Sequence, residues 1–310
     1  MSVLCWLNGQ KTTTLPVMDR SVQYGDGFFT TLLVIQGQVY NWSAHWQRIQ
    51  NSALRFGFPK FIEKDILNLL ASVLADSHPD MHNVFKSEQA CCFNQFKTPL
   101  AIKLVFSRGE GGRGYQPLTE PKPNTLVYIN PHPQFEQACD FTQIQKPIEL
   151  GLCETLCAIQ PQLAGLKHLN RLENVLARNE LRNTPFIEGV MLNLDKEVVC
   201  ATQSNVFMIK DQLLMTPNLE KSGVAGTTRM QMHRIAQMCG LQYQEQILSL
   251  ESLHNADELF LTNALRGVMP IKQFQNRAYA SKQTLEIHNA WVRWQSEHAM
   301  SLTSKGVSCS

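Results

Sequence analysis

The sequence lacks a long apolar run, and it carries little net charge of either sign. Its most lipid-like stretch, ILNLLASVLA at residues 66–75, is interrupted by Asn68 and Ser72 and is shorter than the roughly 18 apolar residues of a membrane span. A formal net charge of +2 gives no electrostatic footprint for nucleic acid or for a membrane surface. We therefore expect neither of these partners. A small anionic ligand stays open, because it needs only a few local cations.

The sequence also lacks an export signal and a metal-binding pattern of cysteines. Its start, MSVLCWLNGQ, has no basic segment followed by a long apolar run. The nine cysteines are odd in number and scattered, and the pairs Cys91–Cys92 and Cys153–Cys157 are not joined by a second pair at zinc-binding spacing. This pattern predicts reduced thiols in a cytoplasmic protein, and no metal site.

What the sequence does contain is enough apolar material for two domains. Hydrophobic residues make up 44% of the 310 residues and charged residues 17%, as in a globular protein, and this length suits two domains. Strand and helix patterns follow one another along the chain, and NPHPQFEQ at residues 130–137 is the best candidate linker. We predict an α/β (α+β) fold with a small N-terminal α/β domain at 1–132 and a larger C-terminal domain at 133–310.

Several short signals predict individual elements. Asn8-Gly9 is typical of a two-residue turn in a β-hairpin. Ser43 is a candidate N-cap for a helix along SAHWQRIQNSALRFGF. Residues 61–76 fit another helix, and residues 77–97 look like an irregular connection. GVAGTTRMQMHRIAQMCGL predicts a helix that Gly240 ends.

The start of that last helix, GVAGTTRM, is a candidate anion site. Unpaired backbone N–H groups and the positive end of the helix dipole gather at a helix N-terminus. Gly226 lets a phosphate approach the backbone closely, and Thr227 and Thr228 can add hydroxyl groups. The same residues also fit an ordinary helix start with a threonine near its cap, and the residues alone leave both interpretations open.

The glycine-rich stretch SRGEGGRGYQP predicts a mobile, exposed loop. Its arginines are shaped to bind a carboxylate through two parallel hydrogen bonds, although a hairpin loop with solvated charges fits equally well.

Two further cations are candidates. Arg48 lies on a predicted helix, where an arginine usually faces solvent. Lys167, in AGLKHLNRLENVLARNEL, follows a turn and has His168 and Arg171 nearby. A reactive amine there needs a pKa below the usual value of about 10.4.

Taken together, these fragments resemble a known family. Seven motifs occur in the same order here as in the fold-type IV pyridoxal-phosphate enzymes: SVQYGDGFFTT, SAHWQRIQ, SRGEGGRGY, GLKHLNRLENV, SNVF, GVAGTTR and LTNALRGVMP. That family holds branched-chain aminotransferases, D-amino-acid aminotransferases and aminodeoxychorismate lyases, and three of the motifs are most similar to the lyases: YGDGFFTT, SRGEGGRGY and GLKHLNRLENV. The resemblance implies a two-domain fold whose larger, pseudo-barrel domain carries the lysine, and a homodimer with active sites near the subunit interface.

The resemblance also implies an activity. The lyases use pyridoxal 5'-phosphate to eliminate pyruvate from 4-amino-4-deoxychorismate, which leaves 4-aminobenzoate, a folate precursor. An aminotransferase acting on a D-amino acid or a branched-chain acid is the alternative within the same fold. A cofactor-binding protein with little catalysis is the alternative from another class.

Individual residues match functional positions of the family. Lys167 corresponds to the lysine that holds the cofactor as a Schiff base and then acts as the general base. Cofactor-binding positions are matched by Arg48, Asn205, Thr227, Thr228 and Asn263. Substrate-facing positions are matched by Phe29, Arg113 and Tyr115, with Arg113 preferred to Arg108 for the carboxylate. Thr30 and Thr31 lie in the segment that lines the cofactor's open face; the choice between them stays open, and we name Thr31 as the catalytic candidate.

One position departs from the family pattern. The family usually has a glutamate five residues before the asparagine of SNVF, where it keeps the cofactor's pyridine nitrogen protonated, and here that position is Cys200. Glu197 lies three residues further upstream and points to the other face of a regular strand, unless a bulge intervenes. A weaker electron sink suits a lyase, whose reaction is also driven by forming an aromatic ring. Cys200 therefore predicts a shift from transamination toward elimination; the alternative is an impaired or differently tuned cofactor site.

Overall fold

The computed structural model describes residues 4–85, 99–131 and 143–302. Contacts divide the chain into two compact units. The first comprises Met1–Asp140, Lys167–Asn170 and His298–Ser310, and the second comprises Phe141–Leu166 and Arg171–Glu297. Both contain helices and β-sheet, so the predicted α/β class is confirmed. The predicted boundary between residues 132 and 133 lies outside the described residues and stays a prediction.

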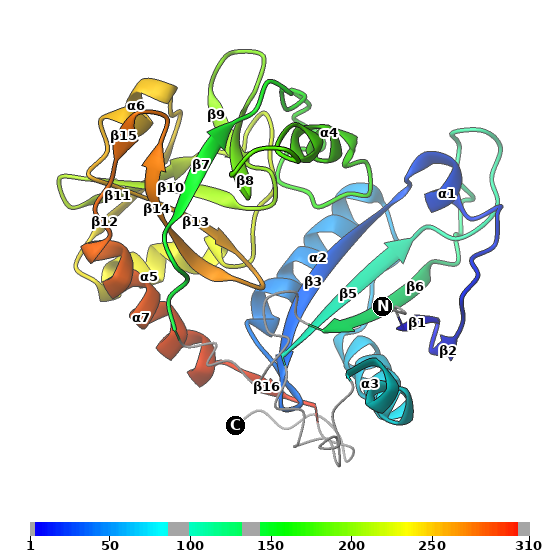
Figure 1. Cartoon of the computed structure of the whole chain (residues 1–310). Coiled ribbons are helices and arrows are strands. Elements are labelled where there is room, and N and C mark those ends of the chain that lie inside the picture. Colours follow the sequence, from blue (N-terminus) through cyan, green and yellow to red (C-terminus); the bar gives the residue numbers. More distant parts are fainter. Residues whose placement is uncertain (1–3, 86–98, 132–142, 303–310) are drawn as a thin grey trace. The chain divides into compact units, whose positions relative to one another are not determined.

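The first unit is built on a seven-stranded sheet (Figure 1). In spatial order its strands are β16 (Met300–Ser301), β4 (Gln38–Val39), β3 (Gly27–Ile35), β5 (Leu100–Ser107), β6 (Asn124–Pro131), β1 (Leu4–Leu7) and β2 (Gln10–Lys11). All neighbouring pairs are antiparallel. The predicted hairpin turn is confirmed, because φ is 51° at Asn8 and 85° at Gly9, the left-handed angles that this turn needs.

Among the described residues of the first unit there are three helices: α1 (Arg20–Tyr24), α2 (Trp42–Phe56) and α3 (Glu63–Phe85). The N-cap of α2 is Asn41 rather than the predicted Ser43, which lies inside the first turn. α3 is longer than predicted, because it continues through Pro79 to Phe85. A proline removes one hydrogen bond from a helix, and here the helix does not end at that position. The remainder of the predicted irregular connection lies outside the described residues.

The core of the first unit lies between one face of the sheet and helices α2 and α3 (Figure 1). Its largest fully buried side chains include Trp6, Trp42 and Phe28. Because alternate residues of a strand point to opposite faces, Phe28 and Thr30 of β3 face this core. Phe29 and Thr31 face the other side of the sheet.

Residues 167–169 extend the same sheet beside the start of β3. Phe29 N donates to Lys167 O at 2.9 Å, and Leu169 N donates to Gly27 O at 3.0 Å. Between them, Phe28 and His168 form an antiparallel bridge. Backbone hydrogen bonds thus fix Lys167 to the first unit, although it lies in the C-terminal half of the sequence.

The second unit is built on a curled, half-barrel sheet of nine strands (Figure 1). In spatial order these are β12 (Gln242–Gln246), β11 (Leu213–Pro217), β10 (Asn205–Lys210), β13 (Glu258–Asn263), β14 (Gly267–Phe274), β7 (Ile148–Leu152), β8 (Glu188–Leu192) and β9 (Val198–Ala201), with β15 (Arg277–Ala278) paired to β14. The sheet is mixed, because β11–β12, β14–β7 and β7–β8 are parallel. It corresponds to the predicted pseudo-barrel.

The helical segments of the second unit are α4 (Leu172–Glu180), the 3-10 turn η2 (Arg229–Gln231), α5 (Met232–Met238), α6 (Leu250–His254) and α7 (Lys282–Glu297). The helix predicted after GVAGTTR is confirmed; it begins as the 3-10 turn and continues as α5. Gly240 follows with φ of 71°, the left-handed angle of a helix-ending glycine. Helices α5 and α7 share a core with Phe207 and Phe260.

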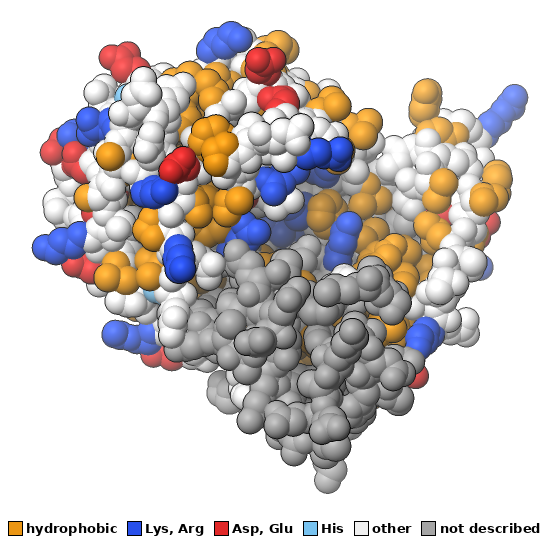
Figure 2. Space-filling view, in the orientation of Figure 1, with side chains coloured by type: hydrophobic (Ala, Val, Ile, Leu, Met, Phe, Trp, Pro, Cys, Tyr) orange, Lys and Arg blue, Asp and Glu red, His pale blue; other side chains and the backbone are white. Residues whose placement is uncertain are grey.

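Three features of the described residues relate to the partners that the sequence predicts to be absent: a membrane, a metal and nucleic acid. Within residues 4–85, 99–131 and 143–302, no helix is long and apolar enough to cross a membrane. No cluster of three or more metal-binding side chains was found in that part of the chain. On the second unit, the face seen in Figure 2 has positive and negative side chains interspersed with hydrophobic ones. Neither sign of charge dominates that face.

Candidate active site

Lys167 lies beside an aromatic ring and a second lysine. Its Nζ is 4.6 Å from the centroid of the Phe29 ring, and the Nζ of Lys103 on β5 is 4.4 Å from the same centroid. Both distances are within the range of cation–π contacts. Burial lowers the pKa of Lys103, because a desolvated ammonium is less stable than a hydrated one. Two amines therefore approach one aromatic side chain.

The register of β3 and β5 places Thr31 on the face that carries these groups. Thr31 is directly opposite Lys103, and opposite residues of an antiparallel pair point to the same face. Phe29 is two residues from Thr31 and shares that face as well. The structure thus brings Phe29, Thr31, Lys103 and Lys167 together, whereas Thr30 faces the core.

Thr30 joins a buried chain of hydrogen bonds with two residues of α2. Its Oγ1 is 2.6 Å from Nδ1 of His45 and accepts from Nη1 of Arg48 at 3.2 Å. All three side chains are buried. Burial, and then the charges of Arg48 and Lys167, hold the pKa of His45 well below 6.5. The imidazole is therefore neutral at pH 7, and the Thr30 hydroxyl, which accepts from Arg48, shares a second hydrogen bond with Nδ1 of His45.

Arg48 remains a cation in this buried position. Burial lowers the pKa of Arg48 to about 10, which is still well above neutral pH. The helix face of α2 therefore presents a fixed guanidinium rather than the solvated arginine that is usual on a helix.

Arg113 and Tyr115 lie on the exposed loop between β5 and β6. The side chain of Tyr115 is 87% exposed, and its ring centroid is 5.5 Å from that of Tyr24. Arg108, at the start of the loop, is buried and forms an ion pair with Asp26 at 2.8 Å. Because Arg108 is held in the protein interior, Arg113 is the loop arginine that solvent and solutes can reach.

In the second unit, four predicted cofactor residues meet around one turn. Asn205 Nδ2 donates to Val224 O at 2.9 Å, and Thr228 Oγ1 donates to Asn263 O at 3.0 Å. A Cβ on Gly226 would lie 2.0 Å from Asn205 Oδ1, so a side chain at this position would clash. The turn that carries Thr227 and Thr228 is thereby tied to Asn205 and to the end of β13.

A buried carboxylate supports this group. Glu188 is fully buried and accepts hydrogen bonds from Thr202 Oγ1 at 2.5 Å, Gln203 N at 3.1 Å and Ser204 Oγ at 2.7 Å. The Ser204 hydroxyl also accepts from Asn263 Nδ2 at 3.1 Å. Glu188 thus fixes the turn between β9 and β10 and, through Ser204, the amide of Asn263.

Cys200 lies on β9 in a buried cluster with Cys153 and Cys157. A hydrogen bond with Cys157, followed by burial, raises the pKa of Cys200 well above 9.0, so its thiol is neutral at pH 7. Arg171 interacts electrostatically with Cys157 and Cys200, and burial lowers the pKa of Arg171. The position that departs from the family pattern therefore holds a neutral thiol near a cation.

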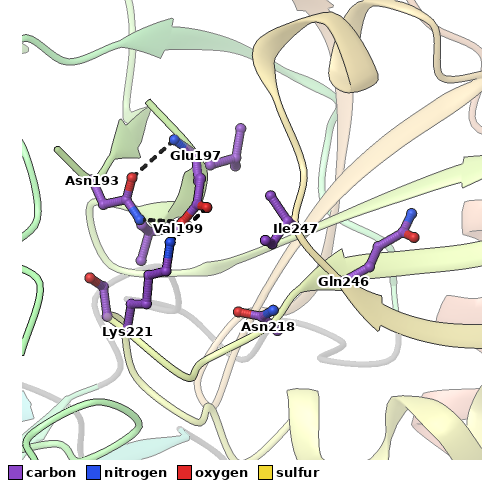
Figure 3. A pocket seen from close by; sticks show the side chains of 9 residues that line it. Asn193, Glu197, Val199, Asn218, Lys221, Gln246 and Ile247 are labelled. Atoms are coloured by element: carbon purple, nitrogen blue, oxygen red, sulfur yellow. Dashed lines mark hydrogen bonds and ion pairs between the residues drawn. The ribbon is translucent and has the colours of Figure 1, made fainter. Parts of the chain in front are cut away.

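The carboxylate of Glu197 forms contacts away from Cys200. A bulge does interrupt the pairing of β8 and β9, because Met191 pairs with Cys200 and Leu192 with Val198. However, the Glu197 carboxylate accepts from Asn193 Nδ2 at 2.7 Å and from Lys221 Nζ at 2.9 Å (Figure 3). These two contacts lower the pKa of Glu197. The three side chains line a small pocket, where Glu197 forms an ion pair with Lys221 and a hydrogen bond with Asn193.

Sequence reasoning did not single out Lys103, His45 or Glu188. Lys103 interrupts the otherwise apolar strand LAIKLVFS, which is a signal that a polar environment faces one side of that strand. His45 precedes Arg48 by three residues, a spacing that puts both on one helix face. No sequence signal marks Glu188, whose partners come from a turn that follows the next strand.

The chain belongs to the class IV aminotransferase family, because the family model of amino-transferase class IV matches residues 27–274. Members of this family use pyridoxal 5'-phosphate, and the chain is an enzyme of this type. The match begins at the strand that carries Phe29 and ends after the strand that follows Asn263. It therefore covers both groups of candidate residues.

Its relatives include lyases and aminotransferases. An aminodeoxychorismate lyase from Vibrio harveyi is 36% identical over 268 residues, which cover 86% of this chain and 89% of the relative. The crystal structure of 4-amino-4-deoxychorismate lyase from Pseudomonas aeruginosa has a TM-score of 0.77 and 32% identity, covering 94% of this chain and 98% of that one. A putative branched-chain-amino-acid aminotransferase from Methanocaldococcus jannaschii is 27% identical over 288 residues, 91% of either chain.

The residues present fit the family's cofactor. An imine with the aldehyde needs an amine, and Lys167 is partly exposed rather than sealed in the core. A phosphate needs fixed positive charge and close backbone approach. Within the first unit, Arg48 is a buried cation. Within the second unit, taken by itself, Gly226 leaves the backbone open to close approach.

Proposed function

We propose that the protein is a 4-amino-4-deoxychorismate lyase, which releases pyruvate and 4-aminobenzoate for folate synthesis. The likeness to lyases from two organisms supports this assignment. The structural observation that carries it is the pair of amines at Phe29, where Lys103 and Lys167 lie within 5 Å of one ring centroid. One amine serves the chemistry and the second serves substrate recognition.

The second amine favours a lyase over a branched-chain aminotransferase. The lyase substrate is a dicarboxylate, with one carboxylate on the ring and another on the enolpyruvyl group, so two cations suit it. Lys103 and Arg113 are the proposed pair. A branched-chain amino acid has one carboxylate and an apolar side chain, and a partly desolvated ammonium would be an unfavourable neighbour for that side chain.

Lys167 acts twice in the proposed reaction. Its amine would hold the cofactor at the aldehyde until the substrate is bound. The freed amine, held beside Phe29, takes the proton from the amine-bearing ring carbon as a general base. When bound, the cofactor supplies the electron sink for that carbon. Enolpyruvate leaves from the adjacent carbon as the ring becomes aromatic.

Thr31 and Lys103 are assigned to the leaving group. They are opposite one another on the face that carries Lys167. Lys103 binds the carboxylate, and Thr31 relays the proton taken up by Lys167 to the methylene carbon of the departing enolate, which becomes pyruvate. Thr30 is not assigned this role, because its hydroxyl is engaged by His45 and Arg48. Phe29 and Tyr115 are assigned apolar contact with the substrate.

The remaining roles concern the cofactor. Arg48 is the proposed phosphate-binding cation. In the second unit, Asn205, Thr227, Thr228 and Asn263 are the proposed neutral donors, since they converge on the turn at Gly226. Cys200 is the proposed neighbour of the pyridine nitrogen. Its neutral thiol would leave that nitrogen less protonated than a carboxylate does.

The decisive experiment is product analysis without an amino acceptor. Purified protein loaded with pyridoxal 5'-phosphate is incubated with aminodeoxychorismate alone. We expect pyruvate and fluorescent 4-aminobenzoate in equal amounts. An aminotransferase, which the 27% identical relative suggests as the alternative, would turn over only after a 2-oxo acid is added. Bound cofactor with no turnover in either assay would favour a binding protein.

A homodimer is part of the proposal, and an apolar face of α4 supports it. Leu172, Val175 and Leu176 are 75%, 51% and 56% exposed, and their spacing puts them on one side of the helix. Contiguous exposed apolar side chains commonly mark interaction sites. Replacing Val175 and Leu176 by Asp should shift sedimentation from dimer to monomer, whereas Leu54→Asp, at an 80% exposed leucine of α2, should not. A monomeric wild type would contradict the proposal.

A cytoplasmic location is also proposed. The five cysteines within the described ranges, Cys5, Cys153, Cys157, Cys200 and Cys239, are free thiols, which is usual where glutathione keeps proteins reduced.

A further inference from the structure

Arg20, the first residue of α1, is a buried arginine that the proposed reaction does not use. Only 5% of the residue is exposed. Its Nε donates to Asp26 Oδ2 at 2.8 Å, its Nη2 to Tyr115 O at 2.9 Å and its Nη1 to Gly114 O at 3.0 Å. A longer contact of 3.4 Å joins Nη1 and Gly111 O. All three nitrogen atoms are engaged, and all of the backbone acceptors belong to the glycine-rich loop between β5 and β6.

The backbone of this loop follows a path that only glycine permits at several points. Gly109, Gly111, Gly112 and Gly114 have φ angles of 83°, 100°, 88° and 57°, a region that other residues rarely adopt. A Cβ on Gly109 would lie 2.1 Å from Lys122 O. The side chains of the loop are exposed, but its backbone is packed closely enough to have one defined path.

Arg20 also reaches a side chain of the loop indirectly. Its Cζ lies 4.8 Å from the ring centroid of Tyr24, and the Tyr24 ring packs edge-on against Tyr115. Arg20 therefore contacts the loop backbone directly and is connected to the exposed Tyr115 ring through one intervening aromatic residue. Arg113 lies between the loop carbonyls that Arg20 binds.

We propose that Arg20 is a positioning residue for substrate recognition. Oriented by Asp26, it sets the path of residues 111–115 and so the direction in which Arg113 presents its guanidinium to a substrate carboxylate. This inference rests on the proposed function, which assigns a carboxylate to Arg113. The planar fork of a guanidinium spreads its donors over three nitrogen atoms and so reaches a carboxylate and several carbonyls at once, whereas the donors of a lysine all lie on one nitrogen.

Arg108 provides a matched control in the same network. Its Nε donates to the same Asp26 Oδ2 at 2.8 Å, and its other two nitrogens donate to Gly57 O and Phe56 O at the end of α2. Arg108 is as buried as Arg20 and also joins a carboxylate to backbone carbonyls. Its acceptors are not in the glycine-rich loop, so a variant of Arg108 removes similar contacts and leaves those of the loop carbonyls with Arg20 in place.

The test compares Arg20→Gln, Arg20→Lys and Arg108→Gln as cofactor-loaded enzymes. In Arg20→Gln we expect the KM for aminodeoxychorismate to rise roughly 10-fold or more while kcat changes less than about 3-fold, because binding geometry is lost but the reacting groups are not. Arg20→Lys should fall between Arg20→Gln and the wild type. Arg108→Gln should change KM less than about 3-fold.

A second measurement follows the loop itself. The rate at which trypsin cleaves the Arg113–Gly114 bond, measured by mass spectrometry, should rise in Arg20→Gln but not in Arg108→Gln.

Two outcomes would overturn the inference. One is an unchanged KM and cleavage rate in Arg20→Gln. The other is an equal rise in both glutamine variants, which would mean that the network only stabilises the fold. If Arg20→Gln fails to fold, Arg20→Lys carries the same comparison. If the wild type lacks lyase activity, the proposed function fails by itself, and the cleavage rates still decide whether Arg20 sets the path of the loop.

Discussion

The two units hold their candidate residues by different physical means. In the first unit the residues are cations placed against aromatic and hydroxyl groups: Lys103 and Lys167 at Phe29, and Arg48 at Thr30. In the second unit they are neutral donors and acceptors tied to a turn, together with the neutral thiol of Cys200. Among the candidate residues, the groups able to move a proton or bind a carboxylate are therefore concentrated on the first unit.

The energetic reason lies in the cost of burying charge. A buried ion without compensating contacts is strongly unfavourable, so each unit limits that cost differently. The first unit lets burial lower the pKa values of Lys103 and His45. The second keeps Glu188 surrounded by three hydrogen-bond donors. Substitutions should therefore have chemical consequences in the first unit and mainly geometric ones in the second.

The largest effect is expected from removing the amine of Lys167. Lys167→Ala should abolish the near-visible absorbance of the lysine-bound cofactor and lower turnover by roughly 1,000-fold or more, because both the covalent attachment and the base are lost. The measurement is an absorbance spectrum with a turnover assay. In the wild type, borohydride reduction and peptide mapping should place the pyridoxyl group on residue 167. Full activity in the alanine variant would end the assignment.

A smaller but still large effect is expected at the neighbouring amine. Lys103→Met keeps an unbranched side chain and removes the charge, so kcat/KM should fall roughly 10- to 100-fold through KM, with the cofactor spectrum unchanged. Arg113→Leu should behave in the same way. Lys122→Met, at an exposed-loop lysine outside this group, is the control. An unchanged KM in Lys103→Met would remove its assignment as the second cation.

Much of this difference between the units was predictable from sequence, because the motifs are local. GLKHLN, SAHWQR and GVAGTTR each identify a residue by its immediate neighbours, and the structure groups Asn205, Thr228 and Asn263 around one turn. The α/β class followed in the same way from alternating strand and helix patterns. The helices and strands follow from periodicity and turn chemistry, whereas the site residues were predicted through the resemblance of these motifs to the family.

What the sequence did not reveal depends on pairing between distant strands. Lys103 is opposite Thr31 only because β5 pairs with β3 in one register, and a shift of one residue would turn it to the other face. Lys167 joins the first unit because its backbone pairs with β3. The choice between Thr30 and Thr31 needed the same information. Strand register is a tertiary property, so no local motif contains it.

An intermediate effect on the reaction is expected from introducing a negative charge at Cys200 in the second unit. Cys200→Glu places a carboxylate near Arg171. The new carboxylate should raise the protonation of the cofactor's pyridine nitrogen and so favour transamination. We expect the ratio of pyruvate release to amino-group transfer to fall roughly 5-fold. Cys200→Ser keeps a small neutral group and is the control. Equal ratios in the two variants would show that charge at this position does not tune the reaction.

The smallest expected effect is a pH dependence of stability that originates in the first unit. Folded His45 has a pKa well below 6.5 because it is buried beside Arg48 and Lys167, whereas the unfolded chain binds a proton at about pH 6.5. Below that pH the unfolded state therefore holds more protons than the folded state, so the free energy of unfolding falls as the pH falls. The loss begins near pH 6.5 and continues down to the folded pKa.

His45→Gln isolates this contribution, because a glutamine amide can still form a hydrogen bond with the Thr30 hydroxyl but cannot take up a proton. Urea unfolding at about pH 7.5 and about pH 5.5 should show the wild type losing more stability than the variant, by at most about 1.4 kcal/mol, the limit for one pH unit below the unfolded pKa. The difference between the proteins cancels the other titrating groups, including Asp19, whose lowered pKa acts in a more acidic range. Parallel pH dependences would mean that His45 has the same pKa in the folded and unfolded states, which would contradict a pKa lowered by burial beside Arg48.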